Sequence, residues 1–148
     1  MKRIIIVLMC FCFTQTSNAQ SSNSQTPTDT CGYAWEQEEL VFRFNPNDYT
    51  DINTSYGMWK QLPKVKLKEV FVSSTLNNWA TNANDYRMTK EGNEYVLRLR
   101  MDKRGSLNRM EFKFVINGKY WVEPKGGCAN TADSGAGYGS KNYVFYFR

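Results

Sequence analysis

Histidine is absent from the 148-residue sequence, and its absence excludes several kinds of active site. A serine–histidine–aspartate triad and a histidine-ligated metal site both depend on the imidazole ring. The carboxylates lie in predicted turns and at exposed strand positions, where Glu111 and Glu123 are interpreted as solvated edge residues, and none forms an acid and nucleophile pair. We therefore expect a protein without enzyme activity, bound metal or cofactor.

Strong charge and long apolar segments are also lacking. The 19 basic and 14 acidic residues give a formal net charge of +5, and the like charges gather only in the alternating Lys64, Lys66 and Lys68. Charge therefore does not point to a nucleic-acid partner. The apolar run Ile4 to Phe13 is too short to cross a bilayer as a helix, so we expect no transmembrane span.

The first 19 residues have the pattern of a cleaved secretory signal. A basic start, Met1-Lys2-Arg3, precedes the apolar run, and Ser17-Asn18-Ala19 offers small residues before a cut. We interpret 1–19 as the signal and Gln20 as the mature start, which predicts an exported protein that is periplasmic, cell-surface or secreted. A lipoprotein is the alternative, although the bulky residues before Cys10 argue against it.

The mature chain divides into a leader and one domain. Residues 20–30 are polar with no apolar residue and predict a flexible leader, whereas residues 31–148 are enough for a single core. Cys31 and Cys128 are the two cysteines outside the signal. In an oxidising compartment such an isolated pair predicts a disulfide, with two free thiols as the alternative.

The clearest local pattern is a β-hairpin. Phe112, Phe114 and Ile116 recur at every second position, as in a strand with one buried face. Asn117-Gly118 then supplies the two residues that tolerate positive φ in a type I′ turn. A partner strand is expected directly after this turn.

A two-residue turn fixes which side chains share a face. It sets Val115 opposite Tyr120 and Phe114 opposite Trp121. Tyr120 is then expected on the outer face beside Lys113, with Trp121 in the core. A bulge in the returning strand would bring Trp121 to the outer face instead.

Alternation elsewhere predicts further short strands, separated by turns and without helical period. We expect an all-β fold of the β-sandwich type, with a small barrel as the alternative. The stretch 48–64 is interpreted as a long connection with one helical turn near 56–59. The predicted strands span 40–44, 65–73, a short segment from 88, 95–101 and 142–147. The predicted core comprises Phe42, Phe44, Val70, Val72, Leu97, Leu99, Phe112, Phe114 and Ile116.

Several short motifs follow one another over 65–148. They are Val70-Phe71-Val72, Leu76-Asn77-Asn78-Trp79, residues 111–120, Glu123-Pro124 and Gly139-Ser140-Lys141-Asn142. Their order resembles that in the glycogen-binding domain of the AMP-activated protein kinase β-subunit and in the family 48 carbohydrate-binding modules. The resemblance implies an early-set immunoglobulin-like sandwich.

The same resemblance implies a sugar site. It makes Trp79 and Tyr120, or Trp121 after a bulge, the aromatics that stack on α-glucan rings. It makes Lys113 and Asn142 hydrogen-bond donors, with Tyr138 and Ser140 as neighbours. Ser74, Leu76 and Asn117 differ from the family pattern, and 125–137 is a longer insertion.

Three functions follow as hypotheses. The first is an exported carbohydrate-binding module for an α-glucan such as glycogen or starch, or another polysaccharide. The second is a structural or protein-interaction sandwich that has lost sugar binding and meets another envelope or secreted protein. The third, a single-strand nucleic-acid binder on a barrel, is disfavoured by export and by the net charge of +3 after signal removal.

The exported protein should begin at Gln20 and contain one Cys31–Cys128 bridge. In the chain-entropy model a loop of this length stabilises by roughly 4 kcal/mol. Intact mass measurement and non-reducing peptide mapping test both points. Alkylation of both thiols without prior reduction would contradict the bridge.

Overall fold

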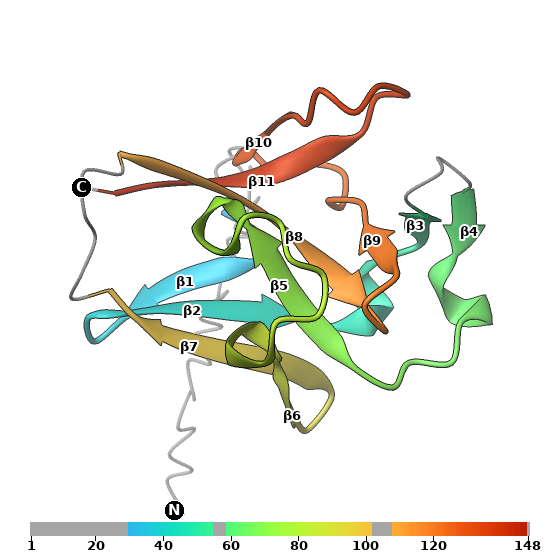
Figure 1. The fold of residues 1–148 in the computed structure, drawn as a ribbon. Helices are drawn as coiled ribbons and strands as arrows, with labels where there is room; N and C mark the ends of the chain where they lie inside the picture. The colour runs from blue at the N-terminus through green and yellow to red at the C-terminus, as the bar shows by residue number, and fades with distance from the viewer. Residues whose placement is uncertain (1–29, 55–58, 102–107, 148) are drawn as a thin grey trace, which may run out of the picture.

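The computed structural model describes residues 30–54, 59–101 and 108–147. These residues form eleven β-strands and four short 3₁₀ helices, with no α-helix among them (Figure 1). No helix in these ranges is long and apolar enough to cross a membrane. The protein is therefore all-β, as the strand pattern predicts.

The strands form two antiparallel sheets. Sheet A has the order β1-β2-β7-β6, and sheet B has the order β10-β11-β8-β9-β3-β4, with β5 on the other edge of β8. Sheet A consists of β1 (Tyr33–Glu36), β2 (Glu39–Phe44), β7 (Glu94–Arg100) and β6 (Thr89–Glu91). Sheet B consists of β3 (Asp51–Thr54), β4 (Trp59–Gln61), β5 (Val70–Ser74), β8 (Arg109–Ile116), β9 (Tyr120–Val122), β10 (Thr131–Asp133) and β11 (Lys141–Tyr146).

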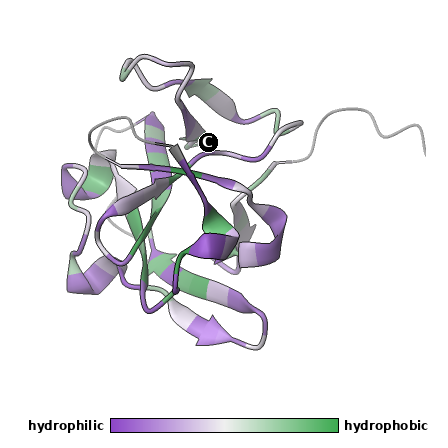
Figure 2. Cartoon of the chain, turned by 90° about the vertical axis from the view of Figure 1, so that its right-hand side faces the viewer, coloured by the Kyte–Doolittle hydropathy of each residue, from purple (hydrophilic) through white to green (hydrophobic). Residues whose placement is uncertain are grey.

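One aromatic core lies between the sheets. Phe42 of β2 meets Phe112 of β8 edge to face at 4.9 Å, and Phe44 lies 5.1 Å from Phe114. Figure 2 shows hydrophobic residues along the inner strands and hydrophilic ones in the outer turns. Seven of the nine predicted core residues are fully buried, while Leu97 and Leu99 are half-buried against the cluster.

Sheet B divides along one edge of β8. The first half of β8 pairs with β11 through Arg109 to Phe112, and the end of β8 pairs with β9 through Val115 and Ile116. The opposite edge of β8 pairs continuously with β5. Lys113 therefore lies where two neighbouring strands leave the same edge.

The central hairpin forms as predicted, but its register is shifted. Asn117 and Gly118 both have positive φ, and the Lys119 amide donates to the Ile116 carbonyl at 3.0 Å. Tyr120, however, pairs with Ile116, and Trp121 pairs with Val115. Lys119 is one extra residue in the returning strand, so the predicted two-residue register is wrong and the bulged alternative holds.

The stretch 48–64 was expected to be a connection, and that expectation is wrong. It contains β3 and β4, together with the 3₁₀ helix Leu62–Lys64. The predicted helical turn falls mainly on 55–58, which lie outside the described residues. Strands of three or four residues are too short for their alternation to show in a sequence. The edge strands β1 and β10 were missed for the same reason, and the strand expected over 65–73 begins only at Val70.

The turn residue Asn117 holds the chain that enters β5. Its Oδ1 accepts hydrogen bonds from the Lys68 amide at 2.9 Å and the Glu69 amide at 3.2 Å. Its Nδ2 donates to the Lys66 carbonyl at 2.9 Å. An aspartate at this position would lack this donor, so the asparagine amide suits both contacts.

The predicted disulfide is present. Cys31 and Cys128 are bonded with their Cα atoms 5.7 Å apart and 97 positions apart in sequence. Asn130 reinforces the junction, because its Oδ1 accepts from the Cys31 amide at 2.8 Å and its Nδ2 donates to the Cys31 carbonyl at 3.0 Å. The bridge ties the start of sheet A to the segment before β10.

Replacing Phe114 by alanine should lower the free energy of unfolding by about 3 to 5 kcal/mol, because the ring is fully buried among Phe44, Tyr49 and Tyr143. Urea unfolding followed by near-ultraviolet circular dichroism measures this loss. The matched control is Tyr146→Ala, since that ring is 63% exposed and should cost little. Similar losses in the two variants would contradict the core assignment.

Candidate functional site

A groove with a volume of about 770 Å³ lies on the outer face of sheet B. Its walls come from β3, β8, β9, the loop after β5 and the segment leading into β11. Six of the seven candidate sugar-contact residues line it together, and the seventh, Tyr120, does not. The six are Trp79, Lys113, Trp121, Tyr138, Ser140 and Asn142.

The loop that carries Trp79 is tightly wound. Ser74 caps the 3₁₀ helix Thr75–Asn77, with its Oγ accepting from the Leu76 amide at 3.2 Å. Asn77 reciprocates, because its Oδ1 accepts from the Ser74 amide at 2.8 Å. Ser74 is therefore the capping residue of this loop.

Trp79 itself has an unusual backbone conformation. Its φ is 60° and that of Asn78 is 53°, in the left-handed region that bulky side chains rarely adopt. The Trp79 amide donates to the Ser74 carbonyl at 2.9 Å, which helps to hold this conformation. Local strain maintained by surrounding bonds is often found at binding sites, and here it directs the indole to the groove.

Two indoles form the aromatic part of the groove. The ring centroids of Trp79 and Trp121 are 6.3 Å apart, and their planes are tilted by 55°. Both side chains are half-buried. Tyr138 on the last loop is 86% exposed and also has a positive φ of 54°. The groove thus offers flat apolar surfaces at an angle to one another.

Lys113 forms part of the groove floor but is only 4% exposed. Its ammonium donates to Glu123 Oε1 at 2.5 Å and to Ser140 Oγ at 2.6 Å. Burial lowers the pKa of Lys113 below its ordinary value, and the hydrogen bond and charge of Glu123 oppose that effect. Two of the three ammonium donors are therefore used within the protein.

Glu123 is the centre of this cluster, and its interpretation as a solvated edge residue is wrong. Its side chain is 10% exposed. Besides Lys113, it accepts from Ser140 Oγ at 2.9 Å, Asn53 Nδ2 at 2.8 Å and the Lys141 amide at 3.1 Å. One carboxylate thus connects β3, β8 and the start of β11.

Asn142 and Glu111 form a second polar pair. Asn142 is 5% exposed, and its Nδ2 donates to Glu111 Oε2 at 2.7 Å. Glu111 also pairs with Arg109 at 2.8 Å, and its side chain is 21% exposed, so it too is more than a solvated edge residue. Glu111 was missed as a groove residue, although its position two before Lys113 in one strand places both on the same face.

Tyr120 lies outside the groove because of the extra residue Lys119. Consecutive strand residues point to opposite faces, so the shift that brings Trp121 to the outer face turns Tyr120 away. Tyr120 lines a different pocket, together with Lys60 and Asn117. The expected pairing of Tyr120 with Lys113 is therefore wrong, and Trp121 takes that position.

No family model, curated protein or solved structure matches this chain. Within the described ranges, no three or more cysteine, aspartate or glutamate side chains gather in a way that could hold a metal ion. The resemblance to glycogen-binding domains consequently depends on the sequence motifs alone.

Changing Glu123 to glutamine should lower the free energy of unfolding by about 3 to 5 kcal/mol, because the Lys113 ammonium would stay buried without its counter-charge. The pKa of Lys113 should also fall further, since Glu123 opposes the effect of burial. Urea unfolding and an NMR titration of the lysine ammonium measure the two effects.

Glu111→Gln is the control, because this carboxylate pairs with Arg109 near the surface and should contribute at most about 1 kcal/mol. If both glutamine variants lose the same stability, the Lys113–Glu123 pair is not the special contact of this cluster.

Proposed function

We propose that this chain is an exported, non-catalytic carbohydrate-binding module whose outer groove holds an α-linked glucan. The observation that carries the proposal is the pair of tilted indoles, Trp79 and Trp121, above a floor of hydrogen-bonding side chains. A sugar ring has an apolar C–H face and a rim of hydroxyls, so it requires both kinds of surface.

The tilt of the indoles favours an α-glucan over a flat polymer. Successive rings of an α-1,4-linked chain turn relative to one another, whereas those of a β-1,4-linked chain form a ribbon. Aromatic planes tilted by 55° fit consecutive rings of a curved chain. A ribbon would engage coplanar aromatics better.

The polar floor supports a weak but oriented interaction. Lys113, Ser140 and Asn142 are each at most 5% exposed and are held by bonds within the protein. Ordering them on binding therefore costs little entropy. A shallow, solvent-exposed site gains little net binding free energy once the cost of desolvation is subtracted. We therefore expect a dissociation constant on the order of 10⁻⁴ M.

The same floor argues for binding without catalysis. Ser140 Oγ and Lys113 Nζ lie 2.6 Å apart, the separation of a nucleophile and its base. Lys113 Nζ, however, donates to Ser140 Oγ, and the serine hydroxyl donates to Glu123 Oε1 at 2.9 Å, so the lysine is not placed as the acceptor of the serine proton. The basic start, the apolar run and the disulfide support export, and the two-sheet arrangement supports the immunoglobulin-like fold.

A protein-interaction module is the second candidate. Trp35 of β1 is 42% exposed and Tyr146 of β11 is 63% exposed, and both line an apolar groove of about 550 Å³ between the edges of the two sheets. Exposed aromatics of this kind are enriched at protein interfaces. This role gains support if the outer groove retains no glucan.

Affinity electrophoresis in amylose or glycogen tests the main proposal. The wild-type protein should be retarded, and Trp79→Ala and Trp121→Ala should each weaken retention at least tenfold, because each removes a stacking surface. The thermal midpoint of Trp79→Ala should change little, since its ring is not part of the core cluster.

The adjacent Tyr120 provides the matched control. Tyr120→Leu should retain full glucan binding, because its ring lies outside the groove. Equal losses in the Tyr120 and Trp121 variants, or absence of retardation in the wild type, would overturn the proposal.

A further inference from the structure

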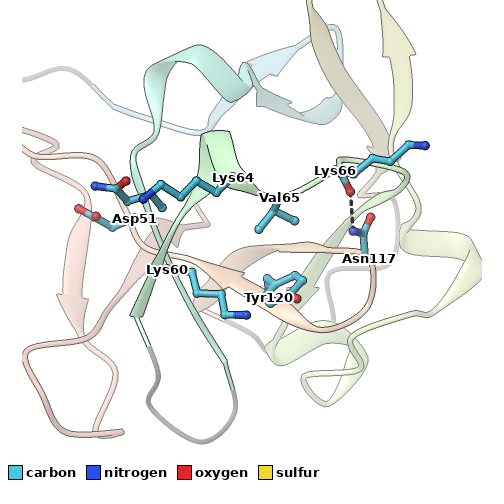
Figure 3. A pocket seen from close by; sticks show the side chains of 8 residues that line it. Asp51, Lys60, Lys64, Val65, Lys66, Asn117 and Tyr120 are labelled. Atoms are coloured by element: carbon cyan, nitrogen blue, oxygen red, sulfur yellow. Dashed lines mark hydrogen bonds between the residues drawn. The ribbon is translucent and has the colours of Figure 1, made fainter.

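A second pocket, with a volume of about 710 Å³, lies beside Tyr120 (Figure 3). Because Tyr120 and Trp121 point to opposite faces of β9, this pocket and the groove lie on different sides of that strand. Lys60 of β4 and the lysines of the connection to β5, Lys64 and Lys66, line it. In Figure 3, Lys64 and Lys66 extend in opposite directions along the pocket, and Lys60 lies near Tyr120. The positive charges are therefore spread along the pocket instead of converging on one point.

Two lysine ammoniums lie over the ring of Tyr120. The ammonium of Lys60 is 5.6 Å from the centroid of the Tyr120 ring, and that of Lys119 is 5.4 Å from it. Both distances are in the range of cation–π attraction. Lys119 is the extra residue of the hairpin, so the same bulge that brings Trp121 to the groove places a cation here.

These lysines lack acidic partners among the residues that the structure describes. Lys60, Lys64, Lys66 and Lys119 form no ion pair there, whereas Arg43, Arg87 and Arg98 are all paired. Asp51 is the one carboxylate that lines the pocket. A group of like charges with little compensation raises the local positive potential, which attracts anions.

The backbone that carries the lysines is fixed. Leu62 is 4% exposed, and its amide donates to the Thr50 carbonyl at 2.8 Å. At the other end, Asn117 holds the Lys66 carbonyl at 2.9 Å. The connection is thus tied to β3 on one side and to the central hairpin on the other, which keeps the lysines spaced.

We propose that this pocket binds an acidic polysaccharide through carboxylate or sulfate groups spaced along its chain. Its volume suits a ligand larger than an inorganic ion. Lysine ammoniums bind such groups as adaptable point charges, and Gln61 and Asp51 offer partners for hydroxyls. The choice of a saccharide over an acidic peptide rests on the proposed carbohydrate function, whereas the anion site rests on the lysines.

Isothermal titration of the mature protein with polygalacturonate at low salt tests this site, with dextran sulfate as the sulfated arm. Lys60→Gln/Lys64→Gln should weaken binding about tenfold, and Tyr120→Leu, which removes the ring but keeps an apolar side chain, about threefold. Lys90→Gln/Arg100→Gln removes the same charge from exposed positions on sheet A and should leave binding unchanged.

Three results would overturn the proposal. The first is an equal loss of affinity in the Lys90/Arg100 control. The second is that polyglutamate or anionic lipid vesicles bind as tightly as both glycans, and the third is that inorganic sulfate binds as tightly as dextran sulfate. Amylose retention separates this site from the groove, because the Lys60/Lys64 variant should keep it and Trp79→Ala should keep polygalacturonate binding. Each proposal can therefore fail without the other.

Discussion

The buried ion pair between Lys113 and Glu123 closes the point at which sheet B divides. β11 and β9 leave the same edge of β8 on either side of Lys113. Ser140 comes directly before β11, and Glu123 comes directly after β9. Without the pair, the division would expose unpaired polar groups at the centre of a sheet. With it, the gap becomes the rigid floor of the groove, so the architecture and the candidate sugar site depend on one contact.

A single inserted residue decides how the two faces of β9 are used. Lys119 shifts the hairpin register by one position, which sends the indole of Trp121 to the groove and the phenol of Tyr120 to the lysine pocket. Because strand side chains alternate, the two consecutive aromatics must serve different surfaces. The chain thereby presents an indole in the groove and a phenol in the basic pocket from adjacent residues.

Local sequence patterns predicted the features that short-range physics controls. The alternation of Phe112, Phe114 and Ile116, the turn at Asn117-Gly118 and the isolated cysteine pair all led to correct structure. The register could not be fixed, because turn residues do not reveal whether Lys119 bulges. The role of Glu123 was missed because its partners come from β3, β8 and the start of β11, and those contacts exist only after folding.

The disulfide also determines how the domain would respond to a pulling force. Tension entering from the N-terminal side reaches Cys31 and passes through the sulfur atoms directly to Cys128, so the intervening chain carries no load. Only β10 and β11 remain between the bridge and the C-terminal end of the described chain. The central strands β2, β7 and β8 and the lysine pocket on β4 and β9 are therefore mechanically shielded. The segment that brings Tyr138, Ser140 and Asn142 to the groove bears the load, and β11, which pairs along β8, is the element that resists extension.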